Sequence, residues 1–186
     1  MTEPTRPHIR EMTADDCPAV AEVRVRGWQH AYAGVVPRTY LDAMSVEEET
    51  AVRREQFGEG AGRAVNLVAE RDGRVVGWGC LGPGRDEDAP AGAAELYTLY
   101  VLPAYLSTGV GRALMAALTA RAEARGSRVL LLWVLAGNAR ARAFYARDGL
   151  RPDGAEASFE IAGVAVRELR YARRLSASSA AAPSLG

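Results

Sequence analysis

The order of hydrophobic and polar residues divides the chain into segments of strand and helix pattern. Apolar residues that alternate with polar ones, or follow one another in short runs, predict strands, and apolar positions three and four apart predict helices. The pattern gives the order strand, two helices, two strands, strand, helix, strand, helix and two final strands. We therefore expect an α/β fold, with a mixed sheet and helices on both of its faces.

The N-terminal half supplies the first strand, two helices and a hairpin. "HIREMT" predicts a short strand, and "CPAVAEVRVRGWQHAYAG" predicts a helix that ends near Gly34. More helix follows in two pieces, and Ser45 with Glu48 forms a capping box that begins the second piece. Asp72-Gly73 is a hairpin turn signal between two predicted strands.

The C-terminal half continues the alternation of strands and helices. "AAELYTLYVLP" predicts a strand, and a helix is expected over Val110–Arg125 with Leu114 and Leu118 on its apolar stripe. "RVLLLWVLAG" is typical of a central strand covered on both faces. Asn138 can cap the next helix, Gly149 can close it, and "ASFEIAGVAVRELRYARRL" predicts the last two strands.

Composition favours one soluble globular domain. The 186 residues are 48% hydrophobic and 25% charged, and this length is sufficient for an independent core. Lysine plus arginine and aspartate plus glutamate both number 23, so the formal net charge is zero. A nucleic-acid-binding protein normally has a basic excess, so we expect no nucleic-acid partner.

The chain ends and the cysteines indicate domain boundaries and cellular location. We expect an N-terminal arm at residues 1–7, one domain over 8–175 and a disordered tail at 176–186. The N-terminus has no signal-peptide pattern and no run approaches the ~18 apolar residues of a membrane span, so we expect a cytoplasmic protein without membrane contact. Cys17 and Cys80 form neither a disulfide framework nor a metal motif, so we expect no bound metal.

The stretch "YLSTGVGRALM", residues 105–115, combines a glycine loop with the start of a helix. The first amides of a helix are unpaired and favour an anion, and Gly109 and Gly111 lack the Cβ that would keep a phosphate away. Residues 108–112 are therefore a candidate pyrophosphate cradle. The alternative is an ordinary tight loop that needs a positive φ.

Two other nucleotide motifs are excluded by their context. "GWGCLG", residues 77–82, matches G-x-G-x-x-G, but "PGRDEDAP" follows it and cannot begin the helix that a dinucleotide site requires. These glycines lie within a strand pattern, where a bulge or twist is expected. The Gly-Lys-Ser/Thr triplet of a Walker A loop is not present in the sequence.

The segments "ELYTLYVLPAYLSTGVGRALMAAL" and "LLLWVLAGNARARAFYARDGLRPDG" together resemble the GNAT family, the GCN5-related N-acetyltransferases. The resemblance covers residues 8–174 in layout, with specific motifs over 95–154, and "GWQHAYAGVVP" resembles a subgroup with antibiotic-resistance-type and polyamine-type enzymes. The matching residues are Val101-Leu102-Pro103, Gly109-Val110-Gly111, Asn138, Ala141, Phe144-Tyr145 and Gly149-Leu150.

The resemblance implies a single-domain GNAT-like fold and acetyl-CoA as co-substrate. The fold would be a mixed, mostly antiparallel, twisted sheet of six to seven strands, splayed at the centre, with about four helices on both faces. The strands at 94–102 and 128–135 would splay apart, with the pantetheine arm between them, and the loop amides would hold the pyrophosphate. Members of the family often dimerise, so a homodimer is left open.

By this resemblance, the cofactor-binding residues come from both splayed strands, the loop and the following helices. They are Leu99, Tyr100, Val101, Ser107, Thr108, Gly109, Val110, Gly111, Arg112, Asn138 and Arg142. One departure concerns Leu106, which stands where the family has glutamine or arginine and cannot donate a hydrogen bond to a phosphate. Backbone amides and the nearby Arg112 remain, so we expect cofactor binding to be weakened and retained, since one charge-assisted hydrogen bond contributes about 1.5–3 kcal/mol.

Acetyl transfer to an amine needs a base, an oxyanion donor and an acid for the departing thiolate. The resemblance assigns the acid to Tyr145, which shares a helix face with Asn138 by i+3 and i+4 spacing, while Phe144 points to the core. The alternative for Tyr145 is a tyrosine packed at a helix–sheet seam. A backbone amide at residues 99–101 would be the oxyanion donor.

Glu95 is the candidate base, because it is a carboxylate that begins an otherwise apolar strand. The alternative is a solvated glutamate at a strand end. Regular alternation places Glu95 on one face with Tyr97, Leu99 and Val101, although a bulge, which the family resemblance implies, would change this phase.

Trp28, His30, Tyr32 and Tyr97 are candidate acceptor-binding residues. His30 is a base or substrate contact in one interpretation and an ordinary surface histidine in the other. Trp28 and Tyr32, four residues apart, form either part of the core or an aromatic cage for a cation.

The function predicted from the sequence is acetyl-CoA-dependent N-acetyl transfer to a primary amine. The acceptor would be a small molecule, such as an amine, an amino-acid-like compound or an antibiotic, and transfer would be direct within a ternary complex. One alternative, favoured by Leu106, is a non-catalytic acyl-CoA-binding module that serves as a sensor or interaction partner. Another is an acetyltransferase for protein N-termini or lysines.

Overall fold

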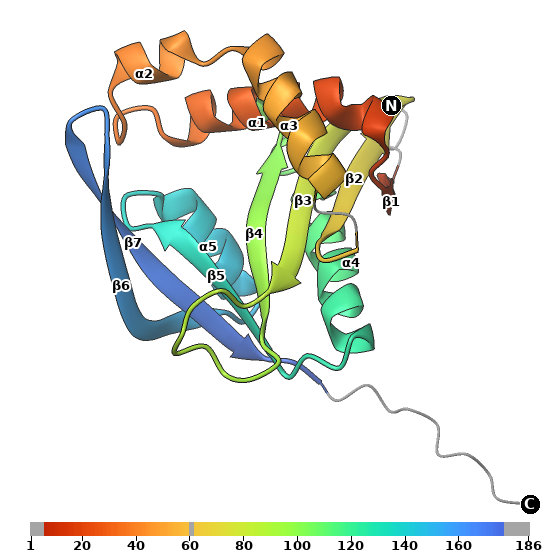
Figure 1. Cartoon of the computed structure of the whole chain (residues 1–186), viewed down its shortest axis with the longest axis vertical. Helices are drawn as coiled ribbons and strands as arrows, with labels where there is room; N and C mark the ends of the chain where they lie inside the picture. Colours follow the sequence, from red (N-terminus) through yellow and green to blue (C-terminus); the bar gives the residue numbers. More distant parts are fainter. Residues whose placement is uncertain (1–5, 60–61, 177–186) are drawn as a thin grey trace, which may run out of the picture.

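One seven-stranded sheet runs through the molecule, with the strand order β1-β2-β3-β4-β5-β7-β6 (Figure 1). The computed structural model describes residues 6–59 and 62–176, so most of the expected arm and all but the first residue of the expected tail lie outside the described residues. Neighbouring strands are antiparallel except for the parallel pair β4 and β5. The strands are β1 His8–Glu11, β2 Val65–Arg71, β3 Arg74–Pro83, β4 Ala94–Val101, β5 Val129–Leu135, β6 Arg151–Ile161 and β7 Val164–Arg174.

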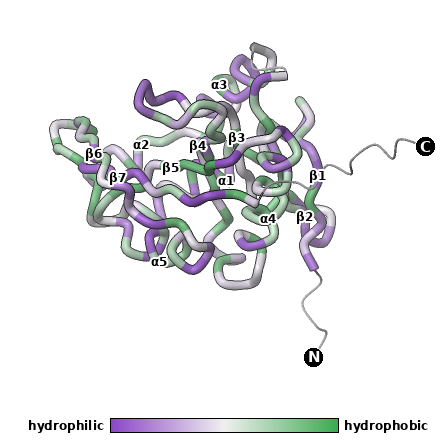
Figure 2. The backbone as a smooth tube through the Cα atoms, turned by 90° about the horizontal axis from the view of Figure 1, so that it is seen from below, coloured by the Kyte–Doolittle hydropathy of each residue, from purple (hydrophilic) through white to green (hydrophobic). Residues whose placement is uncertain are grey.

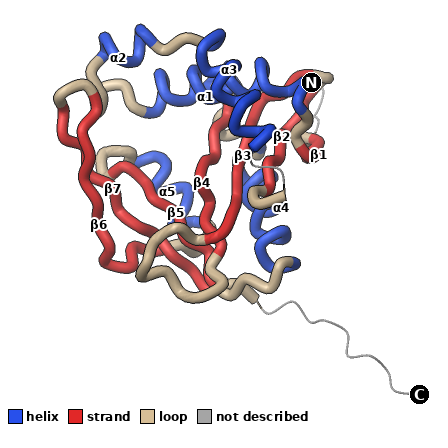
Figure 3. The backbone as a smooth tube through the Cα atoms, in the orientation of Figure 1, coloured by secondary structure: helices blue, strands red, loops and turns tan. Residues whose placement is uncertain are grey.

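Five α-helices in the described residues cover the two faces of the sheet, which confirms the predicted α/β architecture. They are α1 Cys17–Ala31, α2 Arg38–Ala43, α3 Val46–Glu59, α4 Val110–Ala124 and α5 Ala139–Arg147. Figure 3 shows α1 and α3 on one face of the sheet and α4 and α5 on the other. The helix order along the chain is as predicted, with the segment after α1 divided in two.

Local sequence signals place the turns and helix starts where they were expected. Asp72 and Gly73 both adopt left-handed φ values, 53° and 74°, and join β2 to β3 in the predicted hairpin. The Ser45 hydroxyl accepts a hydrogen bond from the Glu48 amide at 3.2 Å and so caps α3. Short-range chemistry is therefore sufficient to explain these boundaries.

The core lies on both faces of the sheet. On one face α4 buries the predicted stripe of Val110, Leu114 and Leu118, and on the other α1 buries Val20 and Val23. A Cβ at Gly77 would stand 2.9 Å from Leu114 Cδ1, and one at Gly79 only 2.5 Å from Leu118 Cδ1. These glycines of β3 therefore allow α4 to approach the sheet closely, which confirms that they belong to a strand. The predominantly hydrophobic central strand β5 can be followed in Figure 2.

The sheet opens at its centre, between β4 and β5. These strands pair only over Ala94–Leu96 and Leu130–Leu132, at the start of β4, and are not paired farther along. On its other edge β4 carries a bulge, because Leu96 pairs with Leu81 and Thr98 with Cys80, leaving Tyr97 as an extra residue. The predicted splay and bulge are both present.

The bulge corrects the regular alternation expected along β4. Glu95 pairs with Gly82, whose added Cβ would meet the Tyr97 ring, so Glu95 and Tyr97 lie on the same face. Leu99 lies beside Gly79 on the α4 face instead. Regular alternation would place Leu99 and Val101 on the same face as Glu95. The extra residue moves these two side chains to the opposite face and brings Thr98 and Tyr100 to the face covered by α1.

Two further properties concern membranes and metals. Over residues 6–59 and 62–176, no helix combines the length and apolar character that a membrane crossing requires. Within the same ranges, no three histidine, cysteine, aspartate or glutamate side chains are grouped as metal ligands. Cys17 and Cys80 are both free and buried.

Candidate active site

Two cavities meet where β4 and β5 separate. The loop-side cavity, about 740 Å3, is lined by the 105–112 loop, β4 and α5. The α1-side cavity, about 750 Å3, is lined by α1, α3, β3 and β4. The lining residues common to both are Tyr32, Leu96, Tyr97, Thr98, Tyr100, Trp133, Leu135 and Glu168. Molecules bound in the two cavities would therefore meet across the gap in the sheet.

The loop-side cavity contains the N-terminus of α4. Gly109 caps this helix with a left-handed φ of 91°, and the amide of Ala113 makes the first helical hydrogen bond, to the Gly109 carbonyl at 3.0 Å. The amides of residues 110–112 precede that bond, and such amides have no acceptor within their own helix. Arg71, the last residue of β2, holds the loop in place, since its Nη2 donates to the Thr108 carbonyl at 3.3 Å. This arrangement fits an anionic phosphate group.

Arg140 brings a positive charge to the loop from α5, and the sequence analysis missed it. Its Nη2 donates to the Ser107 hydroxyl at 3.2 Å, and Arg140 lines the loop-side cavity. Ser107 itself has a left-handed φ of 62°, a backbone conformation that glycine adopts more easily than serine. Leu106 packs partly against the main core. Arg140 thus places a positive charge beside the loop although it lies 34 residues after Leu106 in the sequence.

Most of the predicted cofactor-binding residues line the loop-side cavity. They are Leu99, Tyr100, Val101, Ser107, Gly109, Gly111, Arg112 and Asn138. Three others do not line it. The Thr108 hydroxyl donates to the Tyr105 carbonyl at 2.7 Å, the Val110 side chain is buried in the core, and Arg142 donates to the Tyr171 hydroxyl at 3.1 Å. For Thr108 and Val110, only the backbone is in a position to contribute.

Tyr145 lies on α5 and faces the loop-side cavity. The Asn138 side chain caps α5 as predicted, accepting a hydrogen bond from the Ala141 amide at 3.0 Å. Tyr145 is half-buried, and burial, reinforced by nearby Tyr100, raises its pKa, so the phenol is protonated at neutral pH. Phe144 packs against the main core, as expected, and part of it also lines this cavity.

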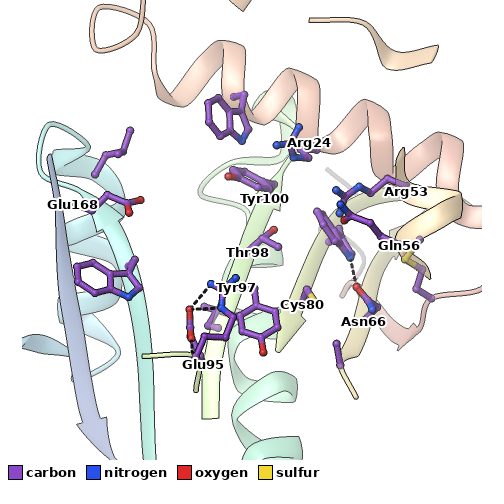
Figure 4. A pocket seen from close by; sticks show the side chains of 18 of the residues that line it. Arg24, Arg53, Gln56, Asn66, Cys80, Glu95, Tyr97, Thr98, Tyr100 and Glu168 are labelled. Atoms are coloured by element: carbon purple, nitrogen blue, oxygen red, sulfur yellow. Dashed lines mark hydrogen bonds and ion pairs between the residues drawn. The ribbon is translucent and has the colours of Figure 1, made fainter. Parts of the chain in front are cut away.

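Glu95 lies in the wall of the α1-side cavity and is only 1% exposed, which excludes the solvated strand-end alternative. One carboxylate oxygen accepts from the Arg85 amide at 2.9 Å, and the other accepts from Arg85 Nε at 3.1 Å and from Nη2 (Figure 4). Arg85 also lies 4.1 Å above the Tyr97 ring, and the Tyr97 hydroxyl donates to the Pro83 carbonyl at 2.6 Å. Both Glu95 oxygens therefore already have partners.

Glu168 on β7 is a second carboxylate at the junction, and the sequence analysis missed it. It is half-buried and lines both cavities. Burial raises its pKa, Arg85 opposes this effect, and Glu95 adds to it. In the described part of the chain it has no ion pair. No local motif marks Glu168, because only the pairing of β7 with β5 brings it to the gap, where it stands opposite Leu135.

The four predicted acceptor-binding residues divide between the two cavities. Trp28 lines the α1-side cavity, His30 lines the loop-side cavity and is exposed, and Tyr32 and Tyr97 line both. The rings of Trp28 and Tyr32 meet edge to face at 4.6 Å and pack against a small second core cluster. Core packing, one of the two open interpretations of this aromatic pair, is therefore present alongside exposure to the cavities.

Comparison with known proteins defines the class. The model of the Acetyltransferase (GNAT) family matches residues 27–150, and the chain belongs to this family. An uncharacterized N-acetyltransferase of Mycobacterium tuberculosis is 33% identical over 139 residues, which cover 75% of this chain and 85% of that protein. The protein is accordingly an acetyltransferase, and acetyl-CoA is the co-substrate of its family.

Solved structures share the fold. The PaiA N-acetyltransferase of Thermoplasma acidophilum, in complex with coenzyme A, has a TM-score of 0.69 at 20% identity and covers 88% of this chain and 98% of its own. A ribosomal-protein-alanine N-acetyltransferase of Brucella melitensis has a TM-score of 0.70 at 26% identity. The match covers 90% of this chain and 99% of that protein. The GNAT-like architecture implied by the sequence motifs is thereby confirmed.

Proposed function

We propose that this protein transfers the acetyl group of acetyl-CoA to a primary amine of a small molecule, with both substrates bound at once. The junction of two cavities at the gap between β4 and β5 carries this proposal, since each cavity can hold one substrate. The α1-side cavity, about 750 Å3, has the size of a typical small-molecule site.

The loop-side cavity is suited to acetyl-CoA. The amides of residues 110–112 would hold the pyrophosphate, and the guanidinium groups of Arg112 and Arg140 would add positive charge. The edge of β4 beyond Leu96 is not paired with β5, so its backbone groups are available to the extended arm of the cofactor. Among them is the amide at 99–101 predicted to stabilise the oxyanion.

The acceptor amine must lose a proton, because an alkylammonium group has a pKa of about 10.4. We assign the role of proton acceptor to Glu168, which would take the amine proton directly or through a water molecule, since this residue lines both cavities. Glu95, the base predicted from the sequence, remains the alternative. Its oxygens would have to exchange hydrogen bonds from Arg85 for the amine.

Tyr145 would donate to the departing sulfur. Acetyl-CoA supplies the acetyl group in the activated form of a thioester, and the thiol released from it has a pKa of about 8.5. Because burial keeps the Tyr145 phenol protonated, it can donate a hydrogen bond that stabilises the negative charge developing on this sulfur. Burial also makes the phenol a weaker acid, so the released thiolate would take its proton from solvent.

The direct test is thiol release from acetyl-CoA with a panel of amines and peptides. Tyr145→Phe should lower kcat by about 100-fold for the best acceptor, with little change in the KM for acetyl-CoA. Tyr40→Phe is a suitable control, because Tyr40 lies exposed on α2 and lines neither cavity. A Tyr145→Phe enzyme that retains the full rate would contradict this role of Tyr145.

The same panel separates the alternatives. Tight coenzyme A binding in calorimetry without turnover of any amine would favour the non-catalytic module, and turnover of peptides alone would favour a protein acceptor. The cytoplasmic location and the possible homodimer remain predictions from the sequence.

A further inference from the structure

The far end of the α1-side cavity has an excess of positive charge. Arg24 on α1 and Arg53 on α3 both line it, and they share one carboxylate, that of Glu49. Arg24 Nη1 lies 2.6 Å from one Glu49 oxygen, and Arg53 Nε lies 2.7 Å from the other. Because one negative charge faces two positive charges, this end keeps a net charge of about +1.

Both guanidinium groups are held in place by tryptophan rings. Arg24 lies 5.3 Å from the centre of the Trp28 ring, and Arg53 lies 5.3 Å from that of Trp78. Glu49 engages one nitrogen of each, and a guanidinium group has five N–H donors. Over residues 6–59 and 62–176, neither arginine has another ion pair. Figure 4 shows Arg24, Arg53 and the neutral Gln56 gathered at this end of the cavity.

The opposite end of the cavity has the opposite sign. Asp86 lies 3.0 Å from Arg170 Nη1 but shares this arginine with Asp88 and Asp153, and Glu95 is paired with Arg85. Glu168 stands at the gap without an ion-pair partner in the described residues. The cavity thus has an unpaired carboxylate near the reacting position and an excess guanidinium group farther away.

We infer that the acceptor is zwitterionic, with its primary amine at Glu168 and an anionic group bound by Arg24 and Arg53. A planar carboxylate, or a phosphonate, would accept two hydrogen bonds from a guanidinium group. An amine without an anionic group would leave the positive end unpaired and would bind more weakly. This inference rests on the proposed acetyl transfer and adds the class of acceptor.

The experiment compares matched acceptors. Free L-amino acids, ω-amino acids of increasing length and aminophosphonates are each paired with the corresponding carboxamide or simple amine. The wild type should acetylate the best anionic acceptor with a kcat/KM at least about tenfold above that of its neutral partner. The two anionic series distinguish carboxylate from phosphonate.

Variants locate this preference. Arg24→Gln and Arg53→Gln should lower kcat/KM for the anionic acceptor by about 10- to 100-fold through KM, with little effect on its neutral partner or on acetyl-CoA. Arg53→Lys should retain part of the preference. Arg26→Gln, on an exposed position of α1 outside both cavities, is the matched control. Thermal melting verifies that each variant is folded.

A gain-of-function variant guards against a merely structural effect. Glu49→Gln should lower the KM for the anionic acceptor, because it removes the charge that the two arginines share. Equal rates with neutral and anionic partners in the wild type, or equal losses for both in folded Arg24→Gln, would overturn the inference while acetyl transfer stands. Turnover of no amine at all would instead refute the proposed function.

Discussion

The two cavities differ in how the chain builds them. The loop-side cavity centres on one continuous segment, residues 105–112, and on backbone amides at the start of α4. The α1-side cavity is assembled from side chains on α1, α3, β3, β4, β5, β6 and β7. The phosphate cradle is therefore a local property of the backbone, whereas the rest of the loop-side cavity and the whole α1-side cavity depend on tertiary packing.

This difference predicts different responses to mutation. A backbone amide cannot be removed by a side-chain substitution, so cofactor binding should change only moderately when side chains around the loop are altered. Acceptor binding depends on individual charged groups, so single substitutions in the α1-side cavity should change its specificity strongly.

The largest effect is expected at the junction. Glu168→Gln should lower kcat/KM by about 100-fold, because an amide cannot accept the amine proton. Since burial raises the pKa of Glu168 above that of an exposed glutamate, the wild-type rate should fall as the pH falls through this raised pKa, where the group becomes protonated. The pH profile of kcat/KM measures this, and the variant should lack that limb. If Glu95→Gln removes the limb instead, Glu95 is the base.

A smaller effect is expected in the loop-side cavity. Arg140→Gln should weaken coenzyme A binding about tenfold, because it removes a charge near the pyrophosphate cradle. Titration calorimetry measures the affinity, and Arg125→Gln, beyond the end of α4, is the control. The KM for the acceptor should not change, and an unchanged coenzyme A affinity would exclude a role of Arg140.

Gly82→Ala should affect the α1-side cavity more than the loop-side cavity, because it displaces Tyr97, which lies at their junction and away from the phosphate cradle. A Cβ at Gly82 would stand 2.6 Å from Tyr97 Cε2 and displace the ring that borders the gap. We expect the acceptor KM to rise about fivefold, with a smaller loss of coenzyme A affinity. Gly58→Ala is the matched control, because a Cβ there meets no atom within 4 Å. An equal loss of both affinities would mean that the two cavities are not separable.

The smallest effect is expected from Leu106→Arg. The new guanidinium group should tighten coenzyme A binding about threefold, less than an isolated charge would, because Arg140 already serves this loop. Calorimetry on the single variant and on the double variant with Arg140→Gln measures the two contributions. The gain should be larger when Arg140 is absent, and an equal or weaker affinity would show that position 106 does not face the phosphate.

The predictions that succeeded rest on contacts close in sequence. The hairpin at Asp72-Gly73 and the cap at Asn138 each depend on a few neighbouring residues. The left-handed φ at Gly109, which was expected only in the alternative interpretation of the glycine loop, is equally local. The buried stripe of α4 follows from helical spacing alone. The gap between β4 and β5 was found through family resemblance, because nothing local marks the point where two paired strands separate.

The phase of β4, the partners of Glu95 and the position of Glu168 could not be read from the sequence. One extra residue at Tyr97 reverses the side chains that follow it, and alternation gives no sign of a bulge. Arg85 reaches Glu95 across a loop, and Arg140 reaches Ser107 from another helix. Such pairings depend on where separate elements dock.

By itself, the sequence determined the order of helices and strands, the glycine loop at the start of α4 and the motifs that define an acetyltransferase. Only the tertiary structure decided which charges face the gap and which are neutralised. The physical reason is the sequence distance over which the interactions act. Backbone conformation and helix capping act over a few residues, whereas Glu168, Arg24 and Arg53 acquire their roles from the packing of elements far apart in the chain.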